Sequence, residues 1–306
     1  MKNIFGISFS DNGMHLVQFR TDAGVSQFIK SSHFPYPFDF RFDSFIKKEN
    51  FNKLAELVLK EKSSQAFDNL EIDITIPYNF AFVKKVSLPK EIIGDLLRVQ
   101  IEWELINYLP DDIANYKINL GNEFVFDDYR ELIVIAIKRS VIRELNEFAL
   151  QCEGNLSSLS LNNFAVENYL NRHGLNDHQK NQLIFKVNRY SIETHFMLSG
   201  EYYTSFLDNI NTLSGHQNKD QKVLEKMVER FKELENLSNQ LSAESQRELQ
   251  VYIYGPSVVD STFDLLRKNF SIELKRIETD KYPVDVPDGI SYVEAIGSVL
   301  RNSDDA

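Results

Sequence analysis

The stretch LPKEIIGDLLRVQIEWELINYLPDD, from Leu88 to Asp112, is bounded by two Leu-Pro pairs. Pro89 fits the start of a helix, because the amide that it lacks would have no partner there. Pro110 disfavours helical geometry at Leu109 and predicts the end of the helix. Between the prolines, apolar residues recur at spacings of three and four, which predicts about five helical turns. The members of this stripe are Ile92, Leu96, Val99, Trp103 and Ile106.

A second apolar row runs beside the first and consists of Ile93, Leu97, Ile101 and Leu105. An apolar arc this broad packs on two sides. The segment is therefore either a core helix or the helix of a subdomain with one face left for a partner. Trp103 is the only tryptophan in the chain. Burial of Trp103 in the core is the favoured interpretation, and Trp103 and Tyr108 are the candidate partner-binding residues if a face is left open.

Length and composition limit the class of protein. A chain of 306 residues predicts two domains or one large bilobed domain. There is no apolar run of about 18 residues, and the start of the chain does not have the pattern of a signal peptide. The single cysteine, Cys152, indicates a reducing compartment, and the net charge of −11 argues against a nucleic-acid or anionic-lipid partner. We expect a cytoplasmic protein that reaches a membrane only through a protein partner.

The first half of the chain alternates between strand and helix patterns. The runs Ile4–Phe9 and Met14–Phe19 flank an Asn-Gly pair, which predicts a hairpin. The alternating run Glu71–Pro77 predicts a half-buried strand, and we expect Ala81–Leu88 to pair with it. Further predicted elements are helices over Phe51–Glu61, Val141–Ala149 and Ser160–Asn171 and a strand over Glu131–Lys138.

The second half opens in the same way, with strand patterns at Leu183–Val187 and Ile192–Leu198 and a third at Glu201–Leu207. A long charged helix follows, beginning at Gln217–Asp220. Its apolar stripe, Leu224 to Leu241, spans under three heptads, which favours docking on its own sheet over a coiled coil. The remaining predicted elements are strands at Gln250–Tyr254 and Ser271–Glu278 and helices ending near Asn269 and spanning Tyr292–Arg301.

Two halves that each open with strand–turn–strand indicate a duplicated α/β unit. This order of features resembles the actin-like ATPase superfamily, and more narrowly the PilM-type type IV pilus assembly proteins, which are similar in fold to the cell-division protein FtsA. The resemblance rests on Leu88-Pro89, on Trp103-Glu104 within the helix, and on Tyr108-Leu109-Pro110 at its end. The segment ELIVIAIKRSVIRELNEFA and the small-residue helix Tyr292–Arg301 also match the family.

The resemblance implies an α/β fold, a duplicated actin-like (ribonuclease H-like) fold of two lobes. The first lobe would span 1–175, with a small α+β subdomain inserted at about 80–138. The second would span 176–306, with a small subdomain and its long helix at about 200–247. The family's role implies a cytoplasmic scaffold of a type IV pilus or related secretion machine. It would dock the cytoplasmic tail of a membrane-anchored PilN-type partner beside the inserted subdomain, at the inner face of the membrane, and a homo-oligomer is left open.

Actin-like ATPases bind Mg-nucleotide between the lobes, with an Asp-x-Gly turn from each half and a Gly-Gly strand end. All three elements are altered in this chain. The positions that correspond to them are Ser8 and Ser10 in the first turn, Lys186 and Asn188 in the second, and Gly255 and Pro256 at the strand end. Loss of both carboxylates removes the usual metal ligands. The resemblance therefore implies a pseudo-ATPase, with no catalytic residue, no metal and no bound ATP.

Two alternatives stay open. An active ATPase with a rearranged site would need a carboxylate for Mg²⁺, and Asp11 and Glu193 are the acidic residues closest to the two turns. The other alternative is that the chain is the cytoplasmic domain of a GspL-like type II secretion protein. Other chemistry is not favoured, since His173 and His178 do not have a zinc-ligand spacing, and Asp111-Asp112 is typical of a solvated turn.

Overall fold

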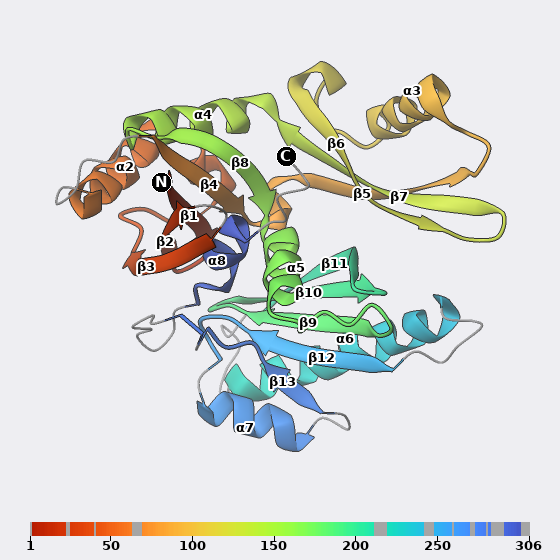
Figure 1. Cartoon of the computed structure of the whole chain (residues 1–306). Coiled ribbons are helices and arrows are strands. Elements are labelled where there is room, and N and C mark those ends of the chain that lie inside the picture. Colours follow the sequence, from red (N-terminus) through yellow and green to blue (C-terminus); the bar gives the residue numbers. More distant parts are fainter. Residues whose placement is uncertain are drawn as a thin grey trace.

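The structure, a computed structural model, describes residues 2–22, 25–39, 41–62, 69–210, 219–241, 248–258, 260–269, 273–279, 281–282 and 291–300. Three sheets organise these residues, two with five strands and one with three (Figure 1). Each five-stranded sheet opens with an antiparallel hairpin and is extended by parallel strands. The molecule is thus a duplicated α/β structure, as the sequence predicts.

The first sheet belongs to the first lobe and has the strand order β3-β2-β1-β4-β8. Two helices, α2 (Lys48–Lys62) and α4 (Arg139–Gln151), pack against each other and cover one face of this sheet (Figure 1). The short helix α1 (Phe42–Phe45) precedes α2. The strands are β1 (Lys2–Ser10), β2 (Gly13–Asp22), β3 (Val25–Phe34), β4 (Leu70–Ile76) and β8 (Asn155–Leu161).

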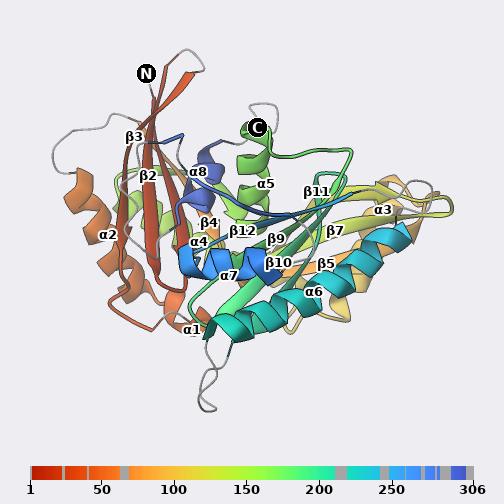
Figure 2. The same ribbon diagram turned by 90° about the horizontal axis from the view of Figure 1, so that it is seen from below.

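The second sheet has the strand order β11-β10-β9-β12-β13. The helices α6 (Lys219–Leu241) and α7 (Asp260–Asn269) lie across its outer face, in the foreground of Figure 2. Met227 and Leu234 of α6 are fully buried in the same core as β9 and β10, which confirms that this helix docks on its own sheet. The strands are β9 (Asn181–Val187), β10 (Ser191–Leu198), β11 (Glu201–Asn209), β12 (Leu249–Tyr254) and β13 (Leu274–Arg276).

Two helices, α5 (Asn162–Arg172) and α8 (Val293–Val299), lie between the two large sheets (Figure 1). Small residues permit their close approach. A Cβ added at Gly297 would lie 1.9 Å from the carbonyl oxygen of Ala165 in α5, and one added at Gly6 of β1 would lie 2.2 Å from the carbonyl oxygen of Ala295. Helix α8 is therefore wedged between α5 and the first sheet.

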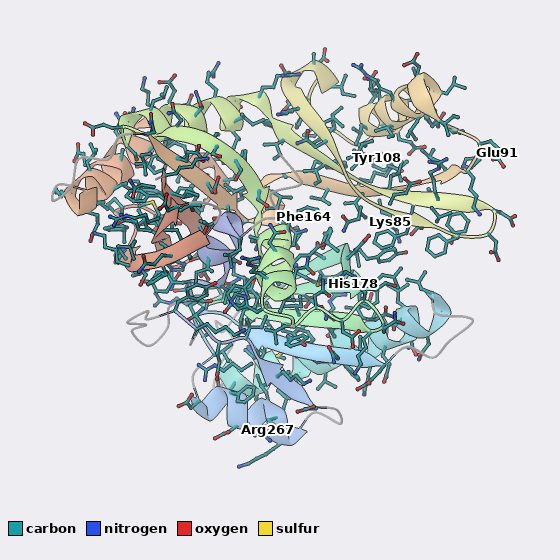
Figure 3. The ribbon with its side chains drawn as sticks, viewed as in Figure 1. Lys85, Glu91, Tyr108, Phe164, His178 and Arg267 are labelled. Carbon is teal, nitrogen blue, oxygen red and sulfur yellow. The ribbon has the colours of Figure 1, made fainter. Side chains whose placement is uncertain are left out.

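The third sheet has the order β5-β7-β6 and is inserted between β4 and α4. It consists of β5 (Phe82–Pro89), β6 (Tyr116–Val125) and β7 (Tyr129–Lys138), and α3 (Gly94–Ile106) covers its outer face. We call residues 82–138 the inserted subdomain. Its other face contacts β11, where the Tyr203 hydroxyl donates to Glu131 Oε2 at 2.6 Å. Lys85, labelled in Figure 3, lies 3.1 Å from the same carboxylate oxygen. We retain the division into lobes at 1–175 and 176–306 as a proposal.

Two expectations for this region are wrong. Pro89 does not begin the helix: it is the last residue of β5, opposite Tyr129, and the helix begins at Gly94. The strand Phe82–Pro89 pairs with β7 and not with β4, because β1 and β8 occupy both edges of β4. A single 3₁₀ turn, Tyr78–Phe80, leads the chain out of the first sheet before β5 begins.

Candidate functional site

The hairpin turns of the two lobes meet at one point. The amide of Arg189, in the β9–β10 turn, donates to Asp11 Oδ2 of the β1–β2 turn at 2.9 Å. A cavity of about 320 Å³ lies beside this contact, which is at the lower end of the range for small-molecule sites. The structure thus brings together three of the predicted nucleotide-site positions and both alternative acids: Ser10, Lys186, Asn188, Asp11 and Glu193 all line this cavity.

Lys186 is the centre of a buried charge cluster. Its side chain is 3% exposed, and its Nζ lies 2.8 Å from Glu294 Oε1 of α8 and 3.4 Å from Glu193 Oε1 of β10. Burial acts against the ammonium charge, but the two carboxylates outweigh it and raise the pKa of Lys186 above its ordinary value. Lys186 is therefore a permanent cation with two acidic partners.

Neutral hydrogen-bond donors complete the cluster. Glu193 accepts from Asn188 Nδ2 at 2.8 Å and from the side-chain amide of Asn162, at the start of α5. Glu294 accepts from the hydroxyl of Tyr254 at 2.9 Å. Burial raises the pKa of Glu294, and Lys186 only partly offsets it. For Glu193, Lys186 and the donors overcome burial and lower the pKa.

The cluster determines what the cleft can do chemically. Two buried carboxylates share one ammonium, so the positive charge of Lys186 is already paired within the protein. The ammonium also lies against the two carboxylates that could otherwise have bound Mg²⁺. Among the described residues, no group of three or more His, Cys, Asp or Glu side chains is placed to hold a metal ion.

Of the other predicted positions, Ser8, Gly255 and Pro256 lie outside the cavity, and the Ser10 hydroxyl is used within its own turn. Ser8 is fully buried in β1, does not line the cavity, and its hydroxyl has no hydrogen-bond partner among the described atoms. The Ser10 hydroxyl donates to the side chain of Asn12 within its own turn. Gly255 has φ +121°, and a Cβ there would lie 2.6 Å from the carbonyl oxygen of Val187. Pro256 beside it is buried, and neither of the two lines the cavity.

The acidic pair Asp111-Asp112 has the structural role that the sequence favours. Asp111 pairs with Lys138 at 2.6 Å, and this lysine lowers the pKa of the carboxyl group. Asp112 accepts from the amide of Ala114 at 2.9 Å and caps the 3₁₀ turn Ile113–Asn115. Both residues therefore stabilise the loop between α3 and β6.

A second cavity, of about 530 Å³, lies in the inserted subdomain between α3 and β6. Apolar side chains make up most of its lining, and its charged residues are Arg98, Lys117, Arg139 and Glu102, of which Arg98 and Glu102 pair with each other at 2.9 Å. The apolar lining residues are Leu97, Ile101, Ile113, Ala114, Tyr116, Ile118 and Leu120. This cavity has the size and character of a site for an apolar ligand or peptide.

The expected burial of Trp103 is wrong. Its side chain is 59% exposed, because α3 turns the other apolar row toward the sheet and buries Ile101 and Leu105 there. Tyr108 is 57% exposed, and the ammonium of Lys84 lies over its ring at 3.0 Å from the centroid. Figure 3 shows Tyr108 beside α3, on the side of the helix that faces the strands. Both candidate partner-binding residues are thus accessible.

Sequence reasoning missed Glu294, Asn162 and Tyr254, which complete the charge cluster from three different elements. One signal for Glu294 was present. It is the only acidic residue in the otherwise apolar and small-residue run YVEAIGSVL, and a charge within such a helix requires a buried partner. Asn162 and Tyr254 carry no comparable signal.

Comparison with known structures identifies the fold. Over 97% of both chains, the structure superposes on a chain of the PilM-PilN type IV pilus biogenesis complex, with a TM-score of 0.71 and 11% identity. The chain has the actin-like fold. A protein of actin-like ATPase fold and unknown function from Bacteroides thetaiotaomicron gives a TM-score of 0.53 at 12% identity, over 98% of this chain and 95% of that one. The ethanolamine utilization protein EutJ from Carboxydothermus hydrogenoformans gives 0.53 at 11% identity, over 98% and 90%.

Sequence-based comparison adds no family assignment, because neither the models of protein families nor the curated proteins contain a match. At identities of 11–12%, the structural likeness establishes the fold and not the activity. In the part of the chain that the structure describes, no helix is both long enough and apolar enough to cross a bilayer.

Proposed function

We propose that this protein is a pseudo-ATPase scaffold of a type IV pilus or related secretion machine. The observation that carries the proposal is the Lys186 ammonium, buried between Glu193 and Glu294 in the cleft where actin-like proteins hold Mg-nucleotide. A cleft whose buried cation is paired with two carboxylates of the same protein does not attract the negative charge of a triphosphate. What the fold then retains is its shape and its surfaces for other proteins.

The partner in this proposal is the cytoplasmic tail of a membrane-anchored PilN-type protein, which would hold the scaffold at the inner face of the membrane. Two observations support it. The fold is shared over 97% of both chains with a protein of the PilM-PilN complex. The lining of the 530 Å³ cavity of the inserted subdomain is mostly apolar and includes three basic residues and one acid, which suits a short apolar tail that carries a carboxylate. We place the docking site there.

Thermal unfolding tests the nucleotide part of the proposal. A ligand at a hundred times its Kd adds about 2.7 kcal/mol to the stability of the folded state, which a melting curve resolves readily. We expect the same Tm with Mg²⁺ alone, Mg-ADP or Mg-ATP at millimolar concentration. A magnesium-dependent rise with ATP would refute the pseudo-ATPase proposal and favour an active site that uses Asp11 or Glu193.

Peptide binding tests the docking part. The probe is a fluorescent peptide with the sequence of a PilN-type cytoplasmic tail, followed by fluorescence polarisation. Leu120→Gln alters the cavity lining, and Leu150→Gln on α4 is the matched control, since the two leucines are 52% and 50% exposed. We expect Leu120→Gln to weaken binding about tenfold and Leu150→Gln to leave it unchanged. Equal binding by all three proteins would exclude this cavity as the docking site.

A further inference from the structure

The outward face of α3 is an exposed apolar stripe that the proposed tail-binding cavity does not use. Leu96, Val99, Trp103 and Ile106 are 69%, 61%, 59% and 59% exposed. None of the four lines the cavity, whose residues from α3 are Gly94, Leu97, Arg98, Ile101 and Glu102. We call these four side chains the α3 seam. Helix α3 lies at the outer edge of the molecule (Figure 1). Isolated exposed apolar residues are ordinary, but four in one line along a helix are typical of an interaction surface.

The spacing within the α3 seam identifies the shape of its occupant. The steps from Leu96 to Val99, to Trp103 and to Ile106 are three, four and three residues. This is the a/d pattern of a heptad repeat, in which the knobs of one helix enter the holes of another. At 100° per residue, the α3 seam lies on the opposite side of the helix from the buried Ile101 and Leu105 and the partly buried Leu97. A second helix can therefore approach it without disturbing the core.

The residues that flank the seam indicate the charge of the occupant. Asp95 and Glu102 border one side of the α3 seam, and Gln100 and Asn107 border the other. The flanks therefore carry acidic charge, although Arg98 pairs with Glu102 at 2.9 Å on the surface. The whole chain has a net charge of −11. Acidic flanks repel an anionic membrane surface, and in an antiparallel pair of α3 helices they would face each other.

We infer that the α3 seam binds an amphipathic helix with basic residues beside its apolar stripe, supplied by a partner protein other than a second copy of this chain. Apolar knobs provide the burial, and lysine or arginine side chains at the flanking positions pair with Asp95 and Glu102. The α3 seam is a second docking surface: its four apolar side chains do not line the cavity, and Glu102 alone borders both. Its occupancy does not depend on whether the cavity binds a PilN-type tail.

The single tryptophan makes the test direct. Because Trp103 is the only tryptophan and lies in the α3 seam, its emission reports occupancy of this surface alone. The probes are three designed peptides, each three heptads long and without tryptophan. The Lys-flanked peptide has Leu at positions a and d and Lys at e and g, and the Glu-flanked peptide has the same Leu stripe with Glu at e and g. The third peptide keeps Lys at e and g but has Gln at a and d. We expect the first peptide alone to shift the emission of the full-length protein to shorter wavelength, with saturation.

Variants assign the effect to the seam. Val99→Gln is expected to weaken binding about tenfold, since Gln keeps helix propensity but removes a buried apolar knob. Val125→Gln is the matched control, because Val125 lies in the same subdomain and is 65% exposed. Asp95→Gln combined with Glu102→Gln is expected to weaken binding of the Lys-flanked peptide about fivefold at low salt.

Four outcomes would overturn the inference. The first two are the absence of a spectral shift with the Lys-flanked peptide, and binding of the Glu-flanked peptide as tight as that of the Lys-flanked one. The third is an equal effect of Val99→Gln and Val125→Gln on the affinity. The fourth is a spectral shift that grows with protein concentration in the absence of peptide, while sedimentation shows a dimer. The last would assign the α3 seam to a second copy of the chain. Leu120→Gln, which tests the cavity, is expected to leave peptide binding at the α3 seam unchanged, so failure of one site is distinguishable from failure of the other.

Discussion

Replacing Lys186 by methionine removes the cation of the buried cluster while keeping a side chain of similar length. Glu193 and Glu294 would then lie buried beside each other without a counter-ion, since both now contact the same ammonium. Removing one partner of a buried ion pair costs about 3–5 kcal/mol, because the remaining charge stays uncompensated. We expect Lys186→Met to lose about that much free energy of unfolding, a large part of the stability of an ordinary domain.

Neutralising the two acids separates the electrostatic cost from the cost of repacking. In the triple variant Lys186→Met, Glu193→Gln, Glu294→Gln, the glutamine oxygens can still accept from Asn188 and Tyr254. We expect this variant to recover most of the loss, to within about 1–2 kcal/mol of the native protein. In the single variant the two carboxyl pKa values rise above that of the unfolded chain. Its stability deficit therefore shrinks as pH falls through those raised values.

Urea unfolding followed by far-ultraviolet circular dichroism measures these differences. Tryptophan fluorescence is a poor probe here, because Trp103 is already 59% exposed in the folded protein. A loss below about 1 kcal/mol in Lys186→Met would contradict the reasoning, since it would mean that water reaches the cluster. A triple variant as unstable as the single one would show that shape, and not charge, holds this region together.

Two further predictions concern packing and pH. Gly297→Ala places a Cβ 1.9 Å from the carbonyl oxygen of Ala165 and is expected to cost about 1–3 kcal/mol of unfolding free energy. Gly121→Ala is the control: the nearest neighbour of its Cβ would be 3.4 Å away, so the Tm should stay nearly unchanged. Equal Tm values for the two variants would refute the tight crossing of α5 and α8. Burial lowers the pKa of His195 from 6.5 to about 4, so stability is full above pH 6.5 and falls as pH drops from 6.5 toward 4. His195→Gln should flatten this slope in urea midpoints measured at a series of pH values, and an unchanged slope would assign it to other groups.

Most of the fold could be predicted from local patterns, and the misses share a physical cause. The hairpins of both lobes, the long helix and the most apolar strands were found because burial on one or both faces imposes a clear period. The strands β3, β6 and β8 were missed, and each lies at the edge of its sheet. An edge strand has fewer buried side chains, and the Ser-rich run NLSSLSL of β8 shows how weak its apolar pattern becomes.

The site illustrates a different limit. The substitutions Lys186 and Asn188 could be identified from their place in the second turn, but their partners come from α5, β12 and α8, so only the folded chain brings Glu294 to Lys186. The orientation of α3 was equally out of reach. Its two apolar rows are alike in composition, and the sequence does not say which row faces the sheet, so Trp103 was assigned to the wrong side.

The contact between Glu131 and Tyr203 joins the inserted subdomain to β11, whereas the chain itself joins it to the first lobe. The subdomain is covalently joined only to the first lobe, through the ends of β5 and β7, yet Tyr203 ties it to β11 of the second lobe. A pulling force applied at α3 therefore divides between two routes, one along the chain into the first sheet and one across this polar contact into the second. We expect a force that a bound partner applies at the inserted subdomain to reach both lobes.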